Sequence, residues 1–273
     1  LQSKDILMVW PTGAGKTHTI ISLIEETSGT TIILTPTLSL MMEYIKQLEM
    51  RSISYLAGSS LQTLSHQALI VEICKKTPRC ILVTHEQMKS WGPDGLIIIN
   101  EAKQIEHVIY DEIHCDLLWG TSFRPPMKEV HNLPEALKFA NRIALTATPM
   151  GGGIENTVEY ADLRKPFVSR RSLFRPNIKL EVFTTKDQDE KTKLLLARVL
   201  PSKKCIIFTS FTDEAKCLVH QFQSITETPV FLFTGNISTK MKVAAFEEFE
   251  KAGSGILIAT SALGKIIFCM FNF

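Results

Sequence analysis

Residues 5–17 have the sequence DILMVWPTGAGKT, an apolar run followed at once by a glycine-rich loop and a lysine. The apolar run predicts a buried strand, and apolar residues through 20–24 are spaced as one face of a helix. A glycine-rich turn between a strand and a helix exposes backbone N–H groups beside the positive end of the helix, where phosphate binds readily. The stretch therefore predicts an α/β domain built around a phosphate-binding loop.

The residue types of this loop indicate magnesium and ATP as its ligands. Lys16 is placed to reach the β- and γ-phosphates, and the hydroxyl of Thr17 is placed to bind Mg²⁺. The strict pattern G-x-x-x-x-G-K-[ST] has a glycine where this sequence has Trp10, so only the shorter form of the pattern is present. The alternative is a structural glycine turn ahead of Lys-Thr, which the flanking strand and helix disfavour. The expected ATP-binding residues are Thr12, Gly13, Ala14, Gly15, Lys16 and Thr17.

A pair of acids follows a second apolar run, at residues 108–110. At a strand end, Asp111 is placed to hold Mg²⁺, and Glu112 to orient and deprotonate an attacking water. Alone, two such acids would indicate a solvated turn, but the phosphate loop favours the catalytic interpretation. We expect His114 to link the nucleotide state to the rest of the domain, with a structural loop histidine as the alternative. The expected catalytic residues are Lys16, Asp111, Glu112 and His114, and the expected Mg²⁺ ligands are Thr17 and Asp111.

A third apolar run ends in Thr146, Ala147 and Thr148, two of which carry hydroxyl groups. Small hydroxyl side chains at a strand end suit hydrogen bonds to the loop of the acidic pair, although the signal is weak in isolation.

Short β-branched runs alternate with helical patterns along the chain, which is typical of βαβ units on a parallel sheet. We expect a first domain at 1–165, a linker at 166–178 and a second, incomplete domain at 179–273. Asp187 with Glu190 predicts a helix start, and a helix at 38–48 carries Met41, Met42, Ile45 and Leu48 as its apolar face. Strands are predicted at 31–35, 54–56, 80–84, 107–111, 142–146, 179–184, 205–209, 230–234 and 255–260.

Composition excludes few function classes. The chain has 273 residues, 45% apolar and 21% charged, with a net charge of +2 that neither requires nor excludes nucleic acid. Its six cysteines show no C-x-x-C spacing, so we expect neither a zinc site nor a disulfide framework. No apolar run reaches the ~20 residues that span a bilayer, so no membrane partner is expected.

Several motifs, in order, resemble those of superfamily 2 helicases: residues 11–17 (PTGAGKT) motif I, 111–114 (DEIH) motif II and 145–149 (LTATP) motif III. Residues 35–41 (TPTLSLM) resemble motif Ia of the RecQ family of DNA helicases within that superfamily. Residues 115–125 (CDLLWGTSFRP) are the most specific match, because they resemble the aromatic-rich loop of RecQ proteins.

The RecQ resemblance continues towards the end of the chain. Residues 174–177 (FRPN) resemble the family's region ahead of its second domain, and 205–211 and 259–264 resemble motif IV and the start of motif V. The resemblance implies two RecA-like domains with parallel sheets flanked by helices, and ATP and Mg²⁺ as cofactors. It also implies 3′ to 5′ translocation on single-stranded DNA, unwinding of forked DNA, a role in recombination or repair, and a nuclear location, with a cytoplasmic one open.

The aromatic loop carries the expected DNA contacts. Trp119 and Phe123 offer flat faces for bases and Arg124 adds charge, and the resemblance assigns all three to DNA binding. Base stacking on aromatic side chains contributes about 1–3 kcal/mol per base without sequence preference. Packing of the two aromatic residues in a core is the alternative.

The sequence departs from the RecQ pattern at both ends. No glutamine-containing adenine-binding segment precedes the first strand, and residues 265–273 match neither the rest of motif V nor motif VI with its arginine finger. We expect a fragment with a truncated or mis-spliced end, whose apolar tail is prone to aggregation. Because an arginine finger is worth about 10³–10⁵ in rate, we expect nucleotide binding with little ATP hydrolysis or strand separation by this chain alone.

The sequence leaves two other functions open. One is a non-catalytic nucleotide- or DNA-binding remnant, which differs from a helicase in having no turnover. The other is a different superfamily 2 translocase, of RNA or chromatin type, which Pro149 favours and the aromatic loop disfavours. The motifs do not identify protein partners.

Overall fold

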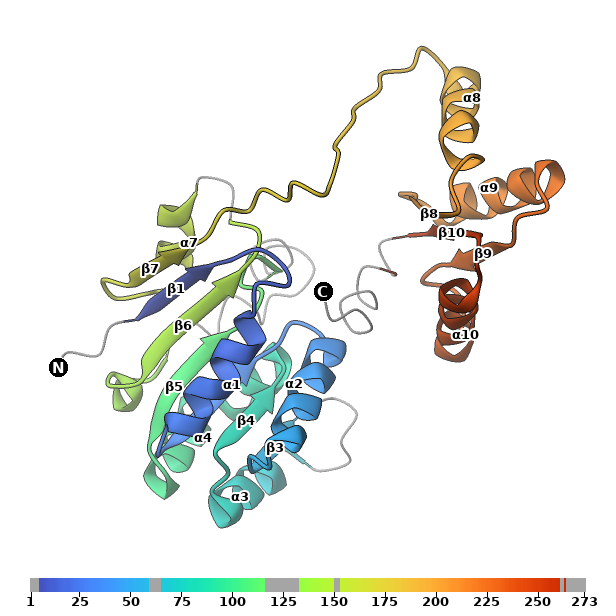
Figure 1. The fold of residues 1–273 in the computed structure, drawn as a ribbon. Helices are drawn as coiled ribbons and strands as arrows, with labels where there is room; N and C mark the ends of the chain where they lie inside the picture. Colours follow the sequence, from blue (N-terminus) through green and yellow to red (C-terminus); the bar gives the residue numbers. More distant parts are fainter. Residues whose placement is uncertain (1–4, 59–64, 116–132, 150–152, 261–262, 264–273) are drawn as a thin grey trace. The chain divides into compact units, whose positions relative to one another are not determined.

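A computed structural model describes residues 5–58, 65–115, 133–149, 153–260 and 263 (Figure 1). The chain divides into two compact units between Arg175 and Pro176. This division lies inside the predicted linker at 166–178. However, Phe167–Arg170 forms a strand of the first unit, paired with the strand that begins the unit, so the first part of the linker prediction is wrong.

The first unit is built on one parallel sheet of seven strands in the order β3-β4-β2-β5-β6-β1-β7. Most of its residues are buried, as in a parallel sheet covered on both faces. The predicted strands of this unit are confirmed, with bounds shifted by one or two residues. The strands are β1 Ile6–Val9, β2 Thr30–Leu34, β3 Tyr55–Gly58, β4 Cys80–Val83, β5 Ile105–Tyr110, β6 Asn141–Thr146 and β7 Phe167–Arg170.

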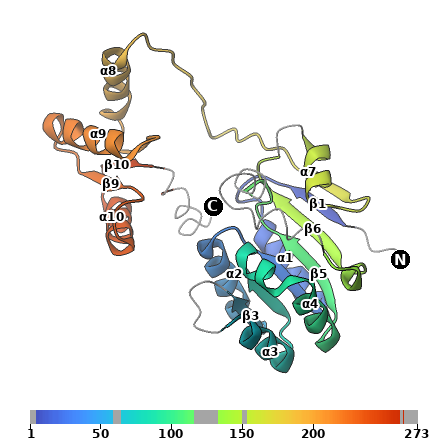
Figure 2. The same cartoon turned by 180° about the vertical axis from the view of Figure 1, so that it is seen from behind.

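Helices cover both faces of this sheet (Figures 1 and 2). Alternate strand residues pack on α1 Lys16–Glu26 and α2 Leu38–Met50 on one face. The strand residues between them pack on α3 His66–Lys76 and α4 His85–Ala102 on the opposite face of the sheet. Two shorter helices are η1 Glu135–Leu137 and α7 Ile154–Tyr160. The three-layered α/β arrangement confirms the expected fold class.

The predicted apolar face of α2 needs one correction. Met41 and Leu48 are buried as expected, but the side chain of Met42 is 62% exposed. Tyr44 is buried in its place, three residues after Met41 and four before Leu48, which is the spacing of a single helix face.

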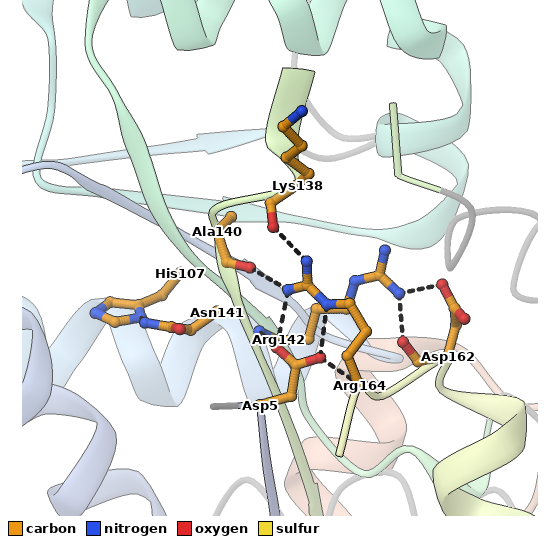
Figure 3. A network of polar contacts seen from close by, with 8 residues as sticks. All are labelled: Asp5, His107, Lys138, Ala140, Asn141, Arg142, Asp162 and Arg164. Carbon is orange, nitrogen blue, oxygen red and sulfur yellow. Dashed lines mark hydrogen bonds and ion pairs between the residues drawn. The ribbon is translucent and has the colours of Figure 1, made fainter. Parts of the chain in front are cut away.

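A polar cluster at the start of β1 and β6, here called the Asp5 clasp, ties together segments that are distant in sequence (Figure 3). The buried carboxylate of Asp5 accepts hydrogen bonds from the backbone N–H groups of Arg142 (2.9 Å) and Arg164 (2.7 Å). The guanidinium of Arg164 adds two more, each 3.0 Å long, and also donates to the carbonyls of Ala140 and Lys138. The clasp therefore fixes β1 against β6 and against the turn that enters β7.

Hydrogen bonding keeps the Asp5 carboxyl ionised in spite of its burial. Burial alone would raise the pKa of Asp5, but the donors from Arg164 and Arg142 outweigh it and hold the pKa below the ordinary value of 3.8. Nearby, Arg142 donates from its guanidinium to the carbonyl and carboxylate of Asp162, which extends the clasp to the end of α7.

A pH dependence follows from the lowered pKa of Asp5. Its contribution to stability is complete above the ordinary value of 3.8, and is lost as the pH falls through the lower pKa of the folded state. The free energy of unfolding of the wild type should therefore exceed that of Asp5→Asn by a constant amount near neutral pH. We expect this difference to shrink below pH 3.8, measured by urea unfolding across a pH series. A difference that grew on acidification would contradict the assignment.

The second unit holds a smaller parallel sheet in the order β8-β10-β9 among its described residues. Phe222 of α9 and Phe246 of α10 lie in the hydrophobic clusters on its two faces. Asp187 caps α8 by accepting a 2.8 Å hydrogen bond from the N–H of Glu190, as predicted. The elements are α8 Gln188–Val199, β8 Lys204–Phe208, α9 Thr212–Ile225, β9 Val230–Phe233, α10 Thr239–Lys251 and β10 Gly255–Ala259.

The predicted strand at 179–184 is wrong. These residues pair with no strand among the described residues, and the side chains of Leu180 and Val182 are 88% and 94% exposed. Their alternation of apolar and polar residues has the period of a strand, but the described part of the chain offers no sheet to cover the apolar side.

None of the described helices is both long and apolar enough to cross a bilayer.

Candidate nucleotide-binding site

The glycine-rich loop joins the end of β1 to the start of α1, as the sequence predicts. Gly13 and Gly15 have φ values of 78° and 87°, in the left-handed region that glycine adopts without strain. An added Cβ at Gly15 would meet no atom within 4 Å, so the backbone conformation, not lack of space, requires glycine there. No side chain caps the N-terminus of α1, so no side chain competes with phosphate for the N–H groups at the start of the helix.

Lys16 lies between this loop and the acidic pair. Its ammonium donates a 3.2 Å hydrogen bond to the carbonyl oxygen of Trp10, at the start of the loop. Its positive charge favours ionisation of both Asp111 and Glu112, although burial leaves the pKa of Asp111 raised, so Lys16 lies near both acids.

The acidic pair occupies a tight, buried turn at the end of β5. The N–H of Asp111 donates to the carbonyl of Leu34 in β2, and the N–H of Ile113 donates to that of Leu145 in β6, each over 3.0 Å. Between these anchors, Glu112 has a φ of 48°. Such a conformation in a residue other than glycine is strained and persists only where neighbouring contacts enforce it.

The pKa values of the two carboxyl groups are shifted in opposite directions. Burial, followed by the charge of Glu112, raises the pKa of Asp111 to about 7. Burial also acts to raise the pKa of Glu112, but contacts from His114 and the charge of Lys16 outweigh it and leave that pKa lowered. Because each of two neighbouring carboxylates disfavours ionisation of the other, the pKa of Asp111 lies above that of Glu112.

His114 connects the acidic pair to the end of β6. Its Nδ1 lies 3.1 Å from the hydroxyl oxygen of Thr146 and 3.3 Å from Oε2 of Glu112. The Thr146 hydroxyl donates to the carbonyl of Thr148 over 2.9 Å, so toward His114 it can only accept. Nδ1 of His114 therefore carries a proton, and the expected bond between the hydroxyl residues and the acidic loop is confirmed.

With this geometry in place, comparison with known proteins assigns the chain to a family. A family described as DEAD/DEAH box helicase matches residues 1–157. The chain belongs to the DEAD/DEAH box helicases. This is a family of enzymes, and the matched part includes the loop, the acidic pair and His114.

Curated relatives of this helicase chain confirm the RecQ resemblance. It is 25% identical over 268 residues to "ATP-dependent DNA helicase RecQ" of Pasteurella multocida, covering 97% of this chain and 41% of that protein. It is 24% identical over 268 residues to "Probable ATP-dependent DNA helicase RecS" of Bacillus subtilis, covering 97% and 53%. The chain thus spans about half the length of these relatives or less.

Solved structures support the fold of the helicase chain. "Mss116p bound to ssRNA and AMP-PNP" matches with a TM-score of 0.65 at 15% identity, over 95% of this chain and 57% of that one. Dbp5 of S. cerevisiae, bound to RNA and ADP BeF3, matches with a TM-score of 0.61 at 17% identity, over 95% and 66%. At these identities the likeness concerns the fold alone.

The donor set of the helicase site fits Mg²⁺. Mg²⁺ in nucleotide sites keeps several waters and takes only one or two protein oxygens besides those of the phosphates. Asp111 offers a carboxyl group and Thr17 a hydroxyl, and the described residues contain no cluster of three metal-ligating side chains that would suit a zinc-like cage. Oε2 of Glu112 is buried and lies 3.3 Å from Nδ1 of His114, which holds this second carboxylate at the site.

Two residues of α2 border the helicase site without having been predicted to do so. Tyr44 is fully buried, and its hydroxyl lies beside Asp111 but outside strict hydrogen-bond geometry. Burial, followed by the charge of Asp111, raises the pKa of Tyr44. Burial, followed by the charge of Glu112, raises the pKa of Glu43. The available signal was the helical spacing of Tyr44 from Met41 and Leu48, which places its phenol on the buried face.

The predicted DNA-binding residues Trp119, Phe123 and Arg124 lie outside the described residues. Their roles stay predictions.

Proposed function

We propose that this chain is the motor part of a RecQ-type, ATP-dependent DNA helicase that moves 3′ to 5′ on single-stranded DNA and unwinds forked duplexes. The proposal rests on the buried acidic pair of Asp111 and Glu112, with His114 against Glu112 and the charge of Lys16, from the phosphate loop, acting on both carboxyl groups. That is the arrangement a phosphoryl-transfer site requires. The names of the relatives support DNA as the nucleic acid.

Each site residue has a role under this proposal. Residues 12–17 wrap the phosphates, with Lys16 on the β- and γ-phosphates, while Thr17 and Asp111 hold Mg²⁺. The bound Mg²⁺ supplies charge that offsets the negative charge of the phosphates. Glu112 orients the attacking water and accepts its proton, and His114 carries the state of Glu112 to β6 through Thr146.

The DNA-facing part of the proposal rests on sequence. Trp119 and Phe123 would stack on bases and Arg124 would contact the backbone, as the aromatic loop of RecQ proteins implies. Relatives occur in the eukaryotes Saccharomyces cerevisiae and Schizosaccharomyces pombe as well as in bacteria, so for a eukaryotic source we propose a nuclear location and a role in recombination or repair.

The 273-residue polypeptide is proposed to bind nucleotide well and to hydrolyse it slowly. Residues 265–273 contain no arginine, so they offer no counterpart of the motif VI arginine finger. Such a finger is worth about 10³–10⁵ in rate.

The replacement of Glu112 with glutamine tests the assignment. We expect Mg²⁺–ATP binding to change less than about threefold, while single-turnover ATP hydrolysis falls by about 100-fold or more, because glutamine cannot accept the proton. Hydrolysis is measured with radiolabelled ATP, with single-stranded DNA or single-stranded RNA present.

Three outcomes separate the candidates. Hydrolysis that depends on Glu112 and is stimulated by DNA supports the RecQ-type motor. Stimulation by RNA alone would favour another superfamily 2 translocase, and hydrolysis no faster in the wild type than in Glu112→Gln would favour a binding remnant. Glu86→Gln, at an exposed position on α4, is the matched control.

A further inference from the structure

Trp10 departs from the strict phosphate-loop pattern, and the proposed function gives it no role. The residue stands where that pattern has a glycine, directly after β1. Its indole N–H donates a 3.0 Å hydrogen bond to the hydroxyl of Ser169 in β7. Ser169 of the neighbouring edge strand, β7, therefore holds the first residue of the loop in place.

Arg171 lies against the same ring. Its guanidinium carbon is 3.6 Å from the centre of the Trp10 ring, a stacked cation–π arrangement. The same guanidinium donates a 3.2 Å hydrogen bond to the carbonyl of Ala14, inside the loop. One planar side chain thus contacts the beginning and the middle of the phosphate loop.

Strand register explains why these residues meet. β7 pairs with β1 in parallel, with Val9 opposite Arg170, and the N–H of Arg171 donates to the carbonyl of Val9 over 3.0 Å. Because side chains two apart in a strand share a face, Ser169 and Arg171 both lie beside the ring of Trp10. A glycine in place of Trp10 would offer Arg171 no surface to stack on.

We propose that Arg171 is a positioning residue for the phosphate-binding loop, holding it through Trp10 and Ala14 in the shape that accepts the phosphates of a nucleoside triphosphate. The inference rests on the proposed function, since it assigns Arg171 to the same site. Lys16 and Arg171 then have complementary parts. When a nucleotide binds, the ammonium of Lys16 exchanges its hydrogen bond to the Trp10 carbonyl for contacts with the phosphates. Arg171 keeps its contacts with Trp10 and Ala14 and so holds the backbone of the loop in place.

Nucleotide affinity tests the proposal in the full chain. For Arg171→Gln we expect the Kd for a fluorescent Mg²⁺–ATP analogue to rise by about three- to tenfold, the range of an exposed cation–π contact together with one hydrogen bond. Arg171→Lys should be weakened similarly, because lysine keeps the charge but loses the planar fork that both stacks and bonds. Arg170→Gln is the matched control, because Arg170 is exposed and carries the same charge at the neighbouring position. Circular dichroism and the thermal midpoint confirm that each variant is folded.

Tryptophan emission gives a second measurement, because a purely structural role of Arg171 would not alter the response of Trp10 to nucleotide. Binding of Mg²⁺–ATP should change the wild-type emission, Trp10→Phe should abolish that change, and Arg171→Gln should reduce it by at least half. A change that persists in Trp10→Phe, or wild-type affinity in Arg171→Gln, would overturn the proposal. So would equal weakening by Arg170→Gln.

Different results would contradict the proposed function and the proposed role of Arg171. If the wild-type chain binds no nucleotide, the proposed function fails. If it binds nucleotide in a manner that depends on Lys16 while both Arg171 variants match the wild type, only the role of Arg171 fails.

Discussion

Replacing Lys16 with alanine should weaken Mg²⁺–ATP binding by about 100-fold, which is the largest effect on ligand binding that we expect from one side chain. Each hydrogen bond between charged groups contributes about 1.5–3 kcal/mol, and Lys16 is placed to make one or two to the phosphates. Its removal also leaves the phosphate charge facing Asp111 and Glu112 without the nearby cation whose charge favours ionisation of both carboxyl groups. Isothermal titration calorimetry of the full chain with a non-hydrolysable ATP analogue measures the change.

Lys75→Ala is the control for that measurement. Lys75 is exposed in the last turn of α3, away from the loop, and its loss removes the same charge from the chain. Equal weakening by the two variants would mean that overall charge, and not the phosphate loop, determines the affinity.

Replacing Asp5 with asparagine should lower the free energy of unfolding of the first unit by about 3 kcal/mol at neutral pH. Removing one partner of a buried ion pair typically costs about 3–5 kcal/mol, and an amide can still accept the hydrogen bond from the N–H of Arg142. The loss is a large fraction of the roughly 5–15 kcal/mol by which domains are stable. Trp10, Trp91 and Trp119 all precede Pro176, so urea unfolding followed by tryptophan fluorescence reports on the first unit.

Asp94→Asn is the matched control for stability. Asp94 is exposed on α4, so its replacement should cost no more than about 1 kcal/mol, the range of a helix-dipole interaction. A loss for Asp5→Asn as small as that of the control would show that the Asp5 clasp is dispensable.

The sequence was most informative where a local pattern and the tertiary structure agree. The strand before the loop, the glycines of the loop and the acids after β5 were predictable, because strand ends in a parallel sheet collect at one edge. The contact between Thr146 and His114 followed from the same rule. These features depend on short stretches whose residue types have few alternative uses.

Other features could not be predicted because they depend on which strands become neighbours. The alternating pattern at 179–184 has the period of a strand, but period alone does not supply a neighbouring strand. The pairing of β7 with β1 unites Arg171 with Trp10 across about 160 positions of sequence, and no local signal marks it. The contribution of Arg164 to the Asp5 clasp is equally remote from Asp5.

The position of β7 has a practical consequence for excising the nucleotide-binding unit. A polypeptide ended at residue 165, where the sequence alone suggested a boundary, would lose the strand that covers the outer edge of β1. It would expose a row of unpaired backbone groups next to the glycine loop, and such an open edge recruits other chains. An excised unit should therefore extend through Arg175, so that β7 remains paired with β1 beside the phosphate loop.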